Sequence, residues 1–220
     1  MSASLTLALD ASTYTGSVAV IGDGRILAEA EAAMRGEREE RLLPAVAQAL
    51  ADAGVGPRGV GRVVCGAGPG SFTSLRIAAS IAKGIAAANE VPLFAVSSLA
   101  LIVAGNELAP GRWLAVLDAL RGESYVAGYE RVDGRVREVA AFALVANSAV
   151  EPMALALGAR SVGPTQGVIS AAPHARGMLA LGEWLHDGGP VDLATWEPRY
   201  GRLAEAQVKW EREHGRTLGG

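Results

Sequence analysis

The sequence is poor in several residue types, and each shortage excludes a class of protein. There is one cysteine, Cys65, so no disulfide can form within the chain, which fits a reducing compartment. There are only two lysines, Lys83 and Lys209, and the net charge is −3. A protein that binds nucleic acid by itself needs a basic surface to neutralise phosphates. We therefore do not expect this chain to hold nucleic acid without a partner.

Long hydrophobic runs and a basic leader are also missing. The most apolar stretch is broken by Lys83, Gly84, Asn89 and Glu90, which leaves it too short for a membrane span. No basic segment precedes an apolar one at the N-terminus, so we expect no signal peptide. Half of the 220 residues are hydrophobic, enough for one large or two small packed domains. These features predict a soluble, cytoplasmic protein.

Histidine patterns typical of catalysis or metal binding are lacking as well. His174, His186 and His214 are isolated, and none pairs with another at the i, i+4 spacing of a helical metal site. The sequence has no G-x-S-x-G motif for a serine nucleophile, although residue order alone leaves a Ser–His–Asp triad open. The sequence therefore predicts no metal site and no catalytic residues.

Apolar runs and turn residues alternate along the chain and predict its elements. We expect strands over 5–9, 16–21, 25–33, 60–65, 91–96, 113–118, 124–131, 135–144 and near 161. We expect helices over 41–53, 71–88, from Ser97 or Ser98 to Ala104, and over 150–157 and 174–185, with one of the two serines as a cap. This order predicts an α/β protein whose mixed sheet carries helices on both faces.

A possible repeat divides the chain in two. Residues 113–118 resemble residues 5–10, because both are apolar runs that end in an aspartate and are followed by strand-like segments. The stretch from Gly105 to Gly111 is rich in turn residues. We therefore predict an N-terminal lobe over 1–104 and a shorter C-terminal lobe over 105–220.

The most informative stretch is the glycine-rich segment 66–71 between a predicted strand and a predicted helix. Such a turn places free backbone N–H groups at the positive end of a helix, where they favour a phosphate. Gly68, Gly70 and Ser71 are the candidate phosphate contacts. The loop lacks the spacing and the lysine of a Walker A motif. The alternative is a tight turn that lets the helix pack closely on the sheet.

Asp10, Ser12 and Thr13 follow the first predicted strand and have two interpretations. In a phosphotransferase such an aspartate holds a metal-bound water and the hydroxyl groups contact phosphate. Alternatively, Asp10 and Ser12 organise a turn through bonds from their side chains to the backbone. The residues alone leave both interpretations open.

The predicted helix over 71–88 is apolar on most sides. Ile77, Ile81 and Ile85 form one stripe, and most of the remaining surface is alanine or glycine. A helix of this kind is covered on all sides, either by the fold or by another subunit. We predict a subunit interface, formed by Phe72, Leu75, Arg76, Ala79, Lys83 and Ala86. An Ala79→Glu change is then expected to block self-association.

Several motifs together resemble one known family. They are Leu7-Ala8-Leu9-Asp10-Ala11-Ser12-Thr13, Arg41-Leu42-Leu43-Pro44, Gly68-Pro69-Gly70-Ser71-Phe72-Thr73-Ser74-Leu75-Arg76-Ile77, Leu117-Asp118-Ala119 with Glu123 and Tyr125, and Glu197-Pro198-Arg199-Tyr200-Gly201-Arg202. The first 130 residues closely resemble the bacterial TsaB (YeaZ) family, and the likeness beyond them is confined to the last motif. The loop with its S-F-T-x-L-R tail is the most specific of these signals.

The resemblance implies a fold and a role. The fold is that of actin, sugar kinases and heat-shock ATPases, with two RNase H-like lobes of mixed sheets and flanking helices. The role is in making threonylcarbamoyladenosine in tRNAs that read ANN codons, as a non-catalytic partner of the TsaD subunit, joined by the TsaE ATPase. The resemblance further implies a homodimer when the chain is alone, ATP or ADP and a metal ion only in the assembled complex, and tRNA contact only through that complex.

Some residues depart from the family pattern. Ser74 and Ala78 stand where glycine is usual or frequent, Leu120 where arginine is common, and Arg38 where many members keep a histidine. The metal-binding histidine pair of TsaD has no counterpart over 38–41. The missing histidines favour a scaffold over a catalyst. The alternative is an enzyme in its own right, a phosphotransferase, ATPase or peptidase that uses Asp10 and the glycine loop.

A third hypothesis is direct tRNA docking by the C-terminal segment. Residues 197–216 contain five basic and four acidic side chains, a net charge of only +1. This small excess makes the segment a weak candidate for phosphate binding.

Overall fold

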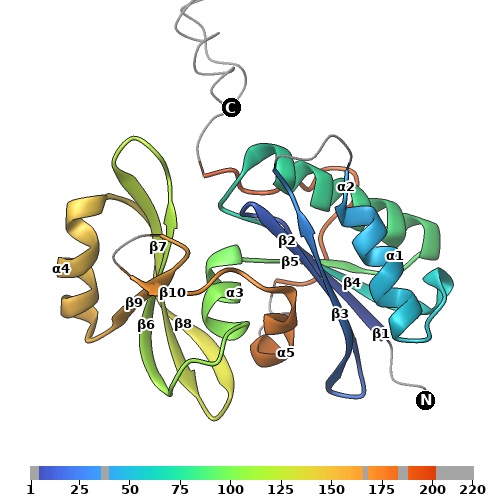
Figure 1. Ribbon diagram of the computed structural model, residues 1–220, viewed down its shortest axis with the longest axis horizontal. Helices are drawn as coiled ribbons and strands as arrows, with labels where there is room; N and C mark the ends of the chain where they lie inside the picture. Colours follow the sequence, from blue (N-terminus) through green and yellow to red (C-terminus); the bar gives the residue numbers. More distant parts are fainter. Residues whose placement is uncertain (1–4, 36–39, 166–167, 183–187, 202–220) are drawn as a thin grey trace, which may run out of the picture.

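The computed structural model describes residues 5–35, 40–165, 168–182 and 188–201. Within these ranges the chain forms two five-stranded mixed sheets, each flanked by helices (Figure 1). His186, His214 and residues 202–216 of the segment considered for tRNA docking lie outside the described residues.

The first sheet is built from residues before the predicted lobe boundary. Its strands are β1 (Leu5–Asp10), β2 (Thr15–Gly22), β3 (Arg25–Ala33), β4 (Val60–Gly66) and β5 (Leu93–Val96), in the order β3-β2-β1-β4-β5. The first three strands form an antiparallel meander, and β4 and β5 continue the sheet parallel to β1. Asp23 and Gly24 turn the chain between β2 and β3 with φ values of 50° and 70°, as the predicted hairpin turn requires.

The second sheet repeats this arrangement. Its strands are β6 (Gly111–Asp118), β7 (Glu123–Val132), β8 (Arg135–Ala146), β9 (Arg160–Gly163) and β10 (Ile169–Ser170), in the order β10-β9-β6-β7-β8. Here too an antiparallel meander comes first and two parallel strands extend it from β6. Two sheets with the same order and directions confirm the predicted repeat and the predicted actin-like fold of two RNase H-like lobes.

Five helices pack on the sheets and complete three apolar cores in the described chain. They are α1 (Leu42–Asp52), α2 (Phe72–Asn89), α3 (Ser98–Ala104), α4 (Asn147–Leu157) and α5 (Met178–Leu181), with short 3-10 turns at Pro57–Gly59 and Ala175–Gly177. α1 and α2 cover the outer face of the first sheet, and α4 covers the outer face of the second. α3 and α5 lie between the two sheets in a core that both sheets share (Figure 1).

Strand β1 shows why the sheet runs are almost uniformly apolar. Its side chains alternate between faces, so Leu7 and Leu9 join the core under α1 and α2 while Ala8 joins the core between the sheets. Both faces are buried, and a strand buried on both faces needs apolar residues throughout. The end of β1 therefore carries Asp10 into the interior.

Two local predictions needed correction. The helix expected over 174–185 is a 3-10 turn followed by the four residues of α5, with residues 183–187 outside the described chain. Ser97 occupies the N-cap position of α3, but its side chain makes no capping bond, and Tyr129 donates to its hydroxyl instead at 3.3 Å. Ser98 does not cap the helix either, because its hydroxyl is directed at Asp10.

The chain finally returns to the first lobe. Residues 190–201, called the strap below, contain no helix or strand and run along α2 (Figure 1). Val191 N donates to Leu93 O at 2.8 Å, and Arg199 N donates to Ala67 O at 2.7 Å. The division at residues 104 and 105 stays a prediction, and part of the sequence assigned to the second lobe packs on the first.

Candidate functional site

The glycine loop connects β4 to α2, and its backbone donors are largely used within the protein. Ala67 N donates to Val96 O at 2.7 Å, and Ser71 N donates to Ser12 O at 2.8 Å. Gly68 N donates to the Ser98 hydroxyl at 3.1 Å. Pro69 has no N–H to offer. The loop therefore connects the chain after β1 with β5 and α3.

Asp10 lies fully buried behind this loop. Its Oδ1 accepts from Ser12 N at 3.0 Å and from the Ser12 hydroxyl at 2.7 Å, and its Oδ2 accepts from the Ser98 hydroxyl at 2.5 Å. Burial raises the pKa of the Asp10 carboxyl, and the bonds from Ser98 and Ser12 oppose that rise. A Cβ on Gly66 would lie 1.9 Å from Oδ2, so the strand needs glycine here.

These contacts are those of the turn-organising interpretation. Asp10 and Ser12 are closed off from solvent, and the Thr13 hydroxyl donates to Thr15 O at 3.1 Å. The assignment of Asp10, Ser12, Thr13, Gly68, Gly70 and Ser71 to a phosphate site stays a prediction. Ser98 was missed as a member of this group, because nothing in the local pattern links it to a residue 88 positions earlier.

The strap lies directly against the glycine loop. A Cβ on Gly68 would lie 2.3 Å from Arg199 O, and a Cβ on Gly201 would lie 2.5 Å from the Tyr125 ring. The strap thus passes from the glycine loop to the second sheet. Any ligand on this side of Gly68 would have to displace the strap backbone.

The structure divides the predicted interface of α2 into two groups. Leu75, Ala79 and Ala86 have at most 5% of their surface exposed, so in this structure they offer no surface to a partner. Phe72, Arg76 and Lys83 remain accessible to different degrees. The prediction is corrected accordingly, because the fold itself covers one side of the helix.

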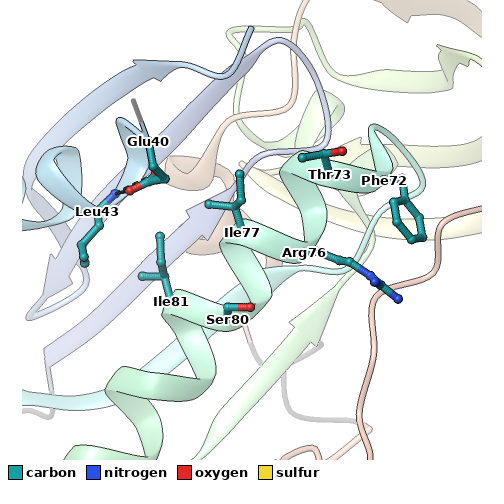
Figure 2. Close-up of a pocket in the computed structure, with 8 residues that line it drawn as sticks. All are labelled: Glu40, Leu43, Phe72, Thr73, Arg76, Ile77, Ser80 and Ile81. Atoms are coloured by element: carbon teal, nitrogen blue, oxygen red, sulfur yellow. Dashed lines mark hydrogen bonds between the residues drawn. The ribbon is translucent and has the colours of Figure 1, made fainter. Parts of the chain in front are cut away.

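An open apolar groove lies beside the accessible group. It has a volume of about 470 Å³ and is lined by Glu40, Leu43, Phe72, Thr73, Arg76, Ile77, Ser80 and Ile81. Figure 2 shows Leu43 on the first turn of α1 facing Ile77 and Ile81 on α2, with Arg76 and Phe72 at the far end. Leu43 is 51% exposed, so it offers apolar surface to the groove.

This groove is the accessible surface that the predicted isoleucine stripe contributes to. Ile77 and Ile81 are half-buried against the core and half-open to the groove. Leu43 shares its helical spacing with Val46 and Leu50 in the helix predicted over 41–53, and that spacing does not indicate that Leu43 is exposed while the other two are buried. The groove can bind an apolar side chain or helix, and its charged groups are Arg76 and Glu40.

Other candidate chemistry is not assembled in the described chain. Among residues 5–35, 40–165, 168–182 and 188–201, no three His, Cys, Asp or Glu side chains come together to hold a metal ion. Cys65 is buried, and burial first and the Asp10 charge second raise the pKa of its thiol, so it is a poor nucleophile. No helix in those ranges is both long and apolar enough to cross a membrane.

Comparison with known proteins places the chain in a family. The family model for TsaD, tRNA N6-adenosine threonylcarbamoyltransferase, matches residues 31–162. The Bacillus subtilis tRNA threonylcarbamoyladenosine biosynthesis protein TsaB is 30% identical over 225 residues, which cover 93% of this chain and 96% of that protein. The chain belongs to the TsaB (YeaZ) family. The Escherichia coli TsaB is 39% identical over 127 residues, 57% of this TsaB-family chain and 54% of that protein.

Solved structures agree with the assignment to the TsaB family. YeaZ from Pseudomonas aeruginosa superimposes with a TM-score of 0.74 at 31% identity, covering 90% of this chain and 99% of that one. A second Pseudomonas aeruginosa structure, described as similar to peptidase YeaZ, gives a TM-score of 0.78 at 32% identity over 90% and 100% of the two chains. The two-lobed fold of this TsaB-family chain is therefore shared over nearly its whole length.

Proposed function

We propose that this chain acts in tRNA threonylcarbamoyladenosine biosynthesis as a non-catalytic subunit that binds and activates a TsaD-like threonylcarbamoyltransferase. The observation that carries the proposal is the contrast between two neighbouring surfaces. The glycine loop directs its donors inward and is covered by the strap, whereas the groove beside it is apolar and open. A chain with this arrangement is better suited to binding a protein than to catalysis.

The chemistry of the groove supports a helical partner. Its apolar wall is formed by Leu43 on α1 and by Ile77 and Ile81, which lie about one helical turn apart on α2, with a cation at one end in Arg76 and a carboxylate near α1 in Glu40. An amphipathic helix with one acidic and one basic side chain in the matching places fits such a surface. The TsaD-like subunit is the proposed occupant in the complex, and a second copy of this chain occupies the groove when the subunit is alone.

The rest of the assembly is proposed on the same basis. A TsaE-like ATPase joins the two subunits, and ATP or ADP and a metal ion bind only in the full complex. The chain reaches tRNA only through that complex, since its own net charge is −3. The proposed location is the cytoplasm, where tRNA is modified.

Reconstitution tests the proposal. The TsaD-like and TsaE-like proteins of the same genome are supplied with tRNA, ATP and a source of the threonylcarbamoyl group, with and without this chain. We expect modified adenosine only when the chain is present, and co-purification of the chain with the TsaD-like subunit. Full modification in its absence would refute the proposal.

The same preparation tests whether the chain is an enzyme alone. Asp10 and the glycine loop are the residues that such an activity would use. ATP binding and hydrolysis by the isolated chain, both lost in an Asp10→Asn variant of unchanged folding stability, would favour a phosphotransferase or ATPase. We expect neither, because both carboxylate oxygens of Asp10 are already bonded to buried partners.

A further inference from the structure

The strap and the first turn of α2 are joined by a cluster of three side chains, Phe72, Arg76 and Tyr200, called the clasp below. The rings of Phe72 and Tyr200 lie 4.4 Å apart between centroids and are tilted by 49°. The Arg76 guanidinium lies 4.3 Å from the Phe72 centroid and 5.4 Å from that of Tyr200, and Arg76 Nε donates to the Tyr200 hydroxyl at 3.1 Å.

Two members of the clasp also line the groove. Phe72 and Arg76 close the end of the groove opposite Leu43 (Figure 2). Tyr200, which holds them, comes from a segment 124 residues further along the chain than Arg76. The surface that the proposed partner meets is therefore formed by side chains of α2, two of which are held by Tyr200 of the strap.

The strap is anchored on both sides of the clasp's tyrosine. Pro198 is buried, Arg199 N bonds to Ala67 O, and Gly201 lies against the Tyr125 ring. Upstream, Val191, Leu193 and Trp196 pack on the core under α2, and Lys83 lies 5.8 Å from the Trp196 ring centroid. With these anchors in place, Tyr200 has little freedom to leave Arg76.

The contacts of the clasp orient Arg76, which as an arginine is charged at neutral pH in any surroundings. The bond to Tyr200 and the nearby charge of Glu197 raise the pKa of the Arg76 guanidinium still further. A long exposed arginine otherwise samples many rotamers, and ordering it on binding costs free energy. A guanidinium already held against two rings has lost much of that freedom before the partner arrives.

We propose that Tyr200 is a positioning residue for the docking surface: through the clasp, the strap holds Phe72 and Arg76 in the arrangement that the TsaD-like subunit binds. The inference rests on the proposed function. It assigns to the C-terminal strap a role in partner affinity, in addition to any contribution to folding.

The test compares partner affinity with folding stability in a variant series. Tyr200→Phe removes the hydroxyl and keeps the ring, and Tyr200→Ala removes both. We expect Tyr200→Ala to raise the Kd for the TsaD-like subunit roughly three- to tenfold, the range expected for ordering one or two side chains. Tyr200→Phe should fall between this variant and the wild type, and melting temperatures should change little.

A double-mutant cycle separates the clasp from a general loss of surface. Arg76→Ala alone and Tyr200→Ala alone should each raise the Kd for the TsaD-like subunit. The double variant should raise the Kd by less than the product of the two single fold-changes. Arg137→Ala is the control, because it removes a surface arginine that pairs with Glu130 on the second sheet and should leave the Kd unchanged.

Each outcome decides something different. An unchanged Kd in Tyr200→Ala, while the wild type binds well, would overturn the role of the strap and leave the proposed function standing. A lowered melting temperature with unchanged Kd in the cold would make the clasp purely structural. No binding by the wild type would count against the proposed function and against this inference together.

Discussion

The Ser98 hydroxyl donates to Asp10 Oδ2 at 2.5 Å, and this bond joins the end of β1 to the first residue of α3. Ser98 also accepts from Gly68 N in the glycine loop. One buried hydroxyl thus connects β1, the glycine loop and α3. Loss of this hydroxyl should therefore affect stability first.

Ser98→Ala is expected to lower the free energy of unfolding by about 1–3 kcal/mol at neutral pH, because a buried carboxylate oxygen and a buried amide lose a partner. The Asp10 pKa is already raised by burial, and removing a bond that lowers it raises it further. A carboxyl whose pKa is higher in the folded state loses stability as pH rises above its ordinary value of 3.8. Urea unfolding should show a larger loss at pH 7.5 than at pH 4.5.

The control for this prediction is the same change in an Asp10→Asn background. The neutral amide of asparagine does not titrate, so the pH-dependent part of the Ser98→Ala loss should disappear there. Equal losses at both pH values in the presence of Asp10 would show that its charge is not what the Ser98 hydroxyl stabilises.

Glycine-to-alanine changes at two positions should have opposite signs. Gly68 has φ of +88°, and a Cβ there would lie 2.3 Å from Arg199 O and 2.9 Å from Leu75 Cδ1. Gly68→Ala should cost about 1–3 kcal/mol through backbone strain and should displace the strap. Gly84 lies exposed within α2 with nothing within 4 Å, so Gly84→Ala should stabilise by about 0.5–1 kcal/mol. Thermal unfolding of both variants checks the pair.

The sequence was sufficient to predict the elements that local pattern determines. The helix expected over 71–88 is α2, Phe72–Asn89, and the strand expected over 25–33 is β3, Arg25–Ala33. Apolar spacing and turn residues act within a few positions, so one sequence carries this information. The repeat of the two lobes could also be seen, because β1 and β6 both end in an aspartate.

The covered side of α2 could not be predicted in the same way. Small residues surround the helix, and which of them are buried depends on how the helix packs on the sheet and on α1, which lie elsewhere in the sequence. From the sequence, Leu75 and Ala79 are as good candidates for contact with a partner as Ser80. In the structure the first two are buried and Ser80 is exposed. The hydrogen bond between Asp10 and Ser98 could not be predicted for the same reason. A contact between residues far apart in the sequence produces no local periodicity.

The buried position of Ala79 changes the variant that tests self-association. Ala79→Glu, chosen from the sequence, should destabilise the fold itself, because Ala79 is 5% exposed and a buried carboxylate has no partner there. Ser80→Glu instead places a charge at an exposed position on the wall of the groove. It should weaken self-association and binding of the TsaD-like subunit at least tenfold, because it adds a carboxylate to the apolar groove about one helical turn from Arg76, with an unchanged melting temperature.

Ala156→Glu is the matched control for Ser80→Glu. Ala156 is exposed on α4, at the opposite end of the molecule in Figure 1. The Ala156→Glu variant should have the elution volume of the wild type and the same Kd for the TsaD-like subunit. If both charged variants behave alike in size-exclusion chromatography and in titration, the groove is not the docking surface.

His174 should make stability depend on pH in the mildly acidic range. It lies at the start of the 3-10 turn that packs on β2, with its Nδ1 accepting from Arg176 N at 3.2 Å. Burial first and Arg176 second lower its pKa from the ordinary 6.5, against the opposing charges of Glu29 and Glu31, which lie 3.5 and 3.3 Å from its ring nitrogens.

The sign follows from which state takes up the proton. Because the folded-state pKa is lower, the unfolded chain binds a proton at His174 before the folded chain does. The stabilisation is complete above pH 6.5 and is lost as pH falls through that value toward the folded-state pKa, at about 1.4 kcal/mol for each unit of lowering. His174→Asn keeps an acceptor for Arg176 N and cannot titrate. Urea unfolding at pH 7.5, 6.5 and 5.5 should therefore show a steeper loss for the wild type than for the variant, and parallel curves would show that His174 is protonated equally in both states.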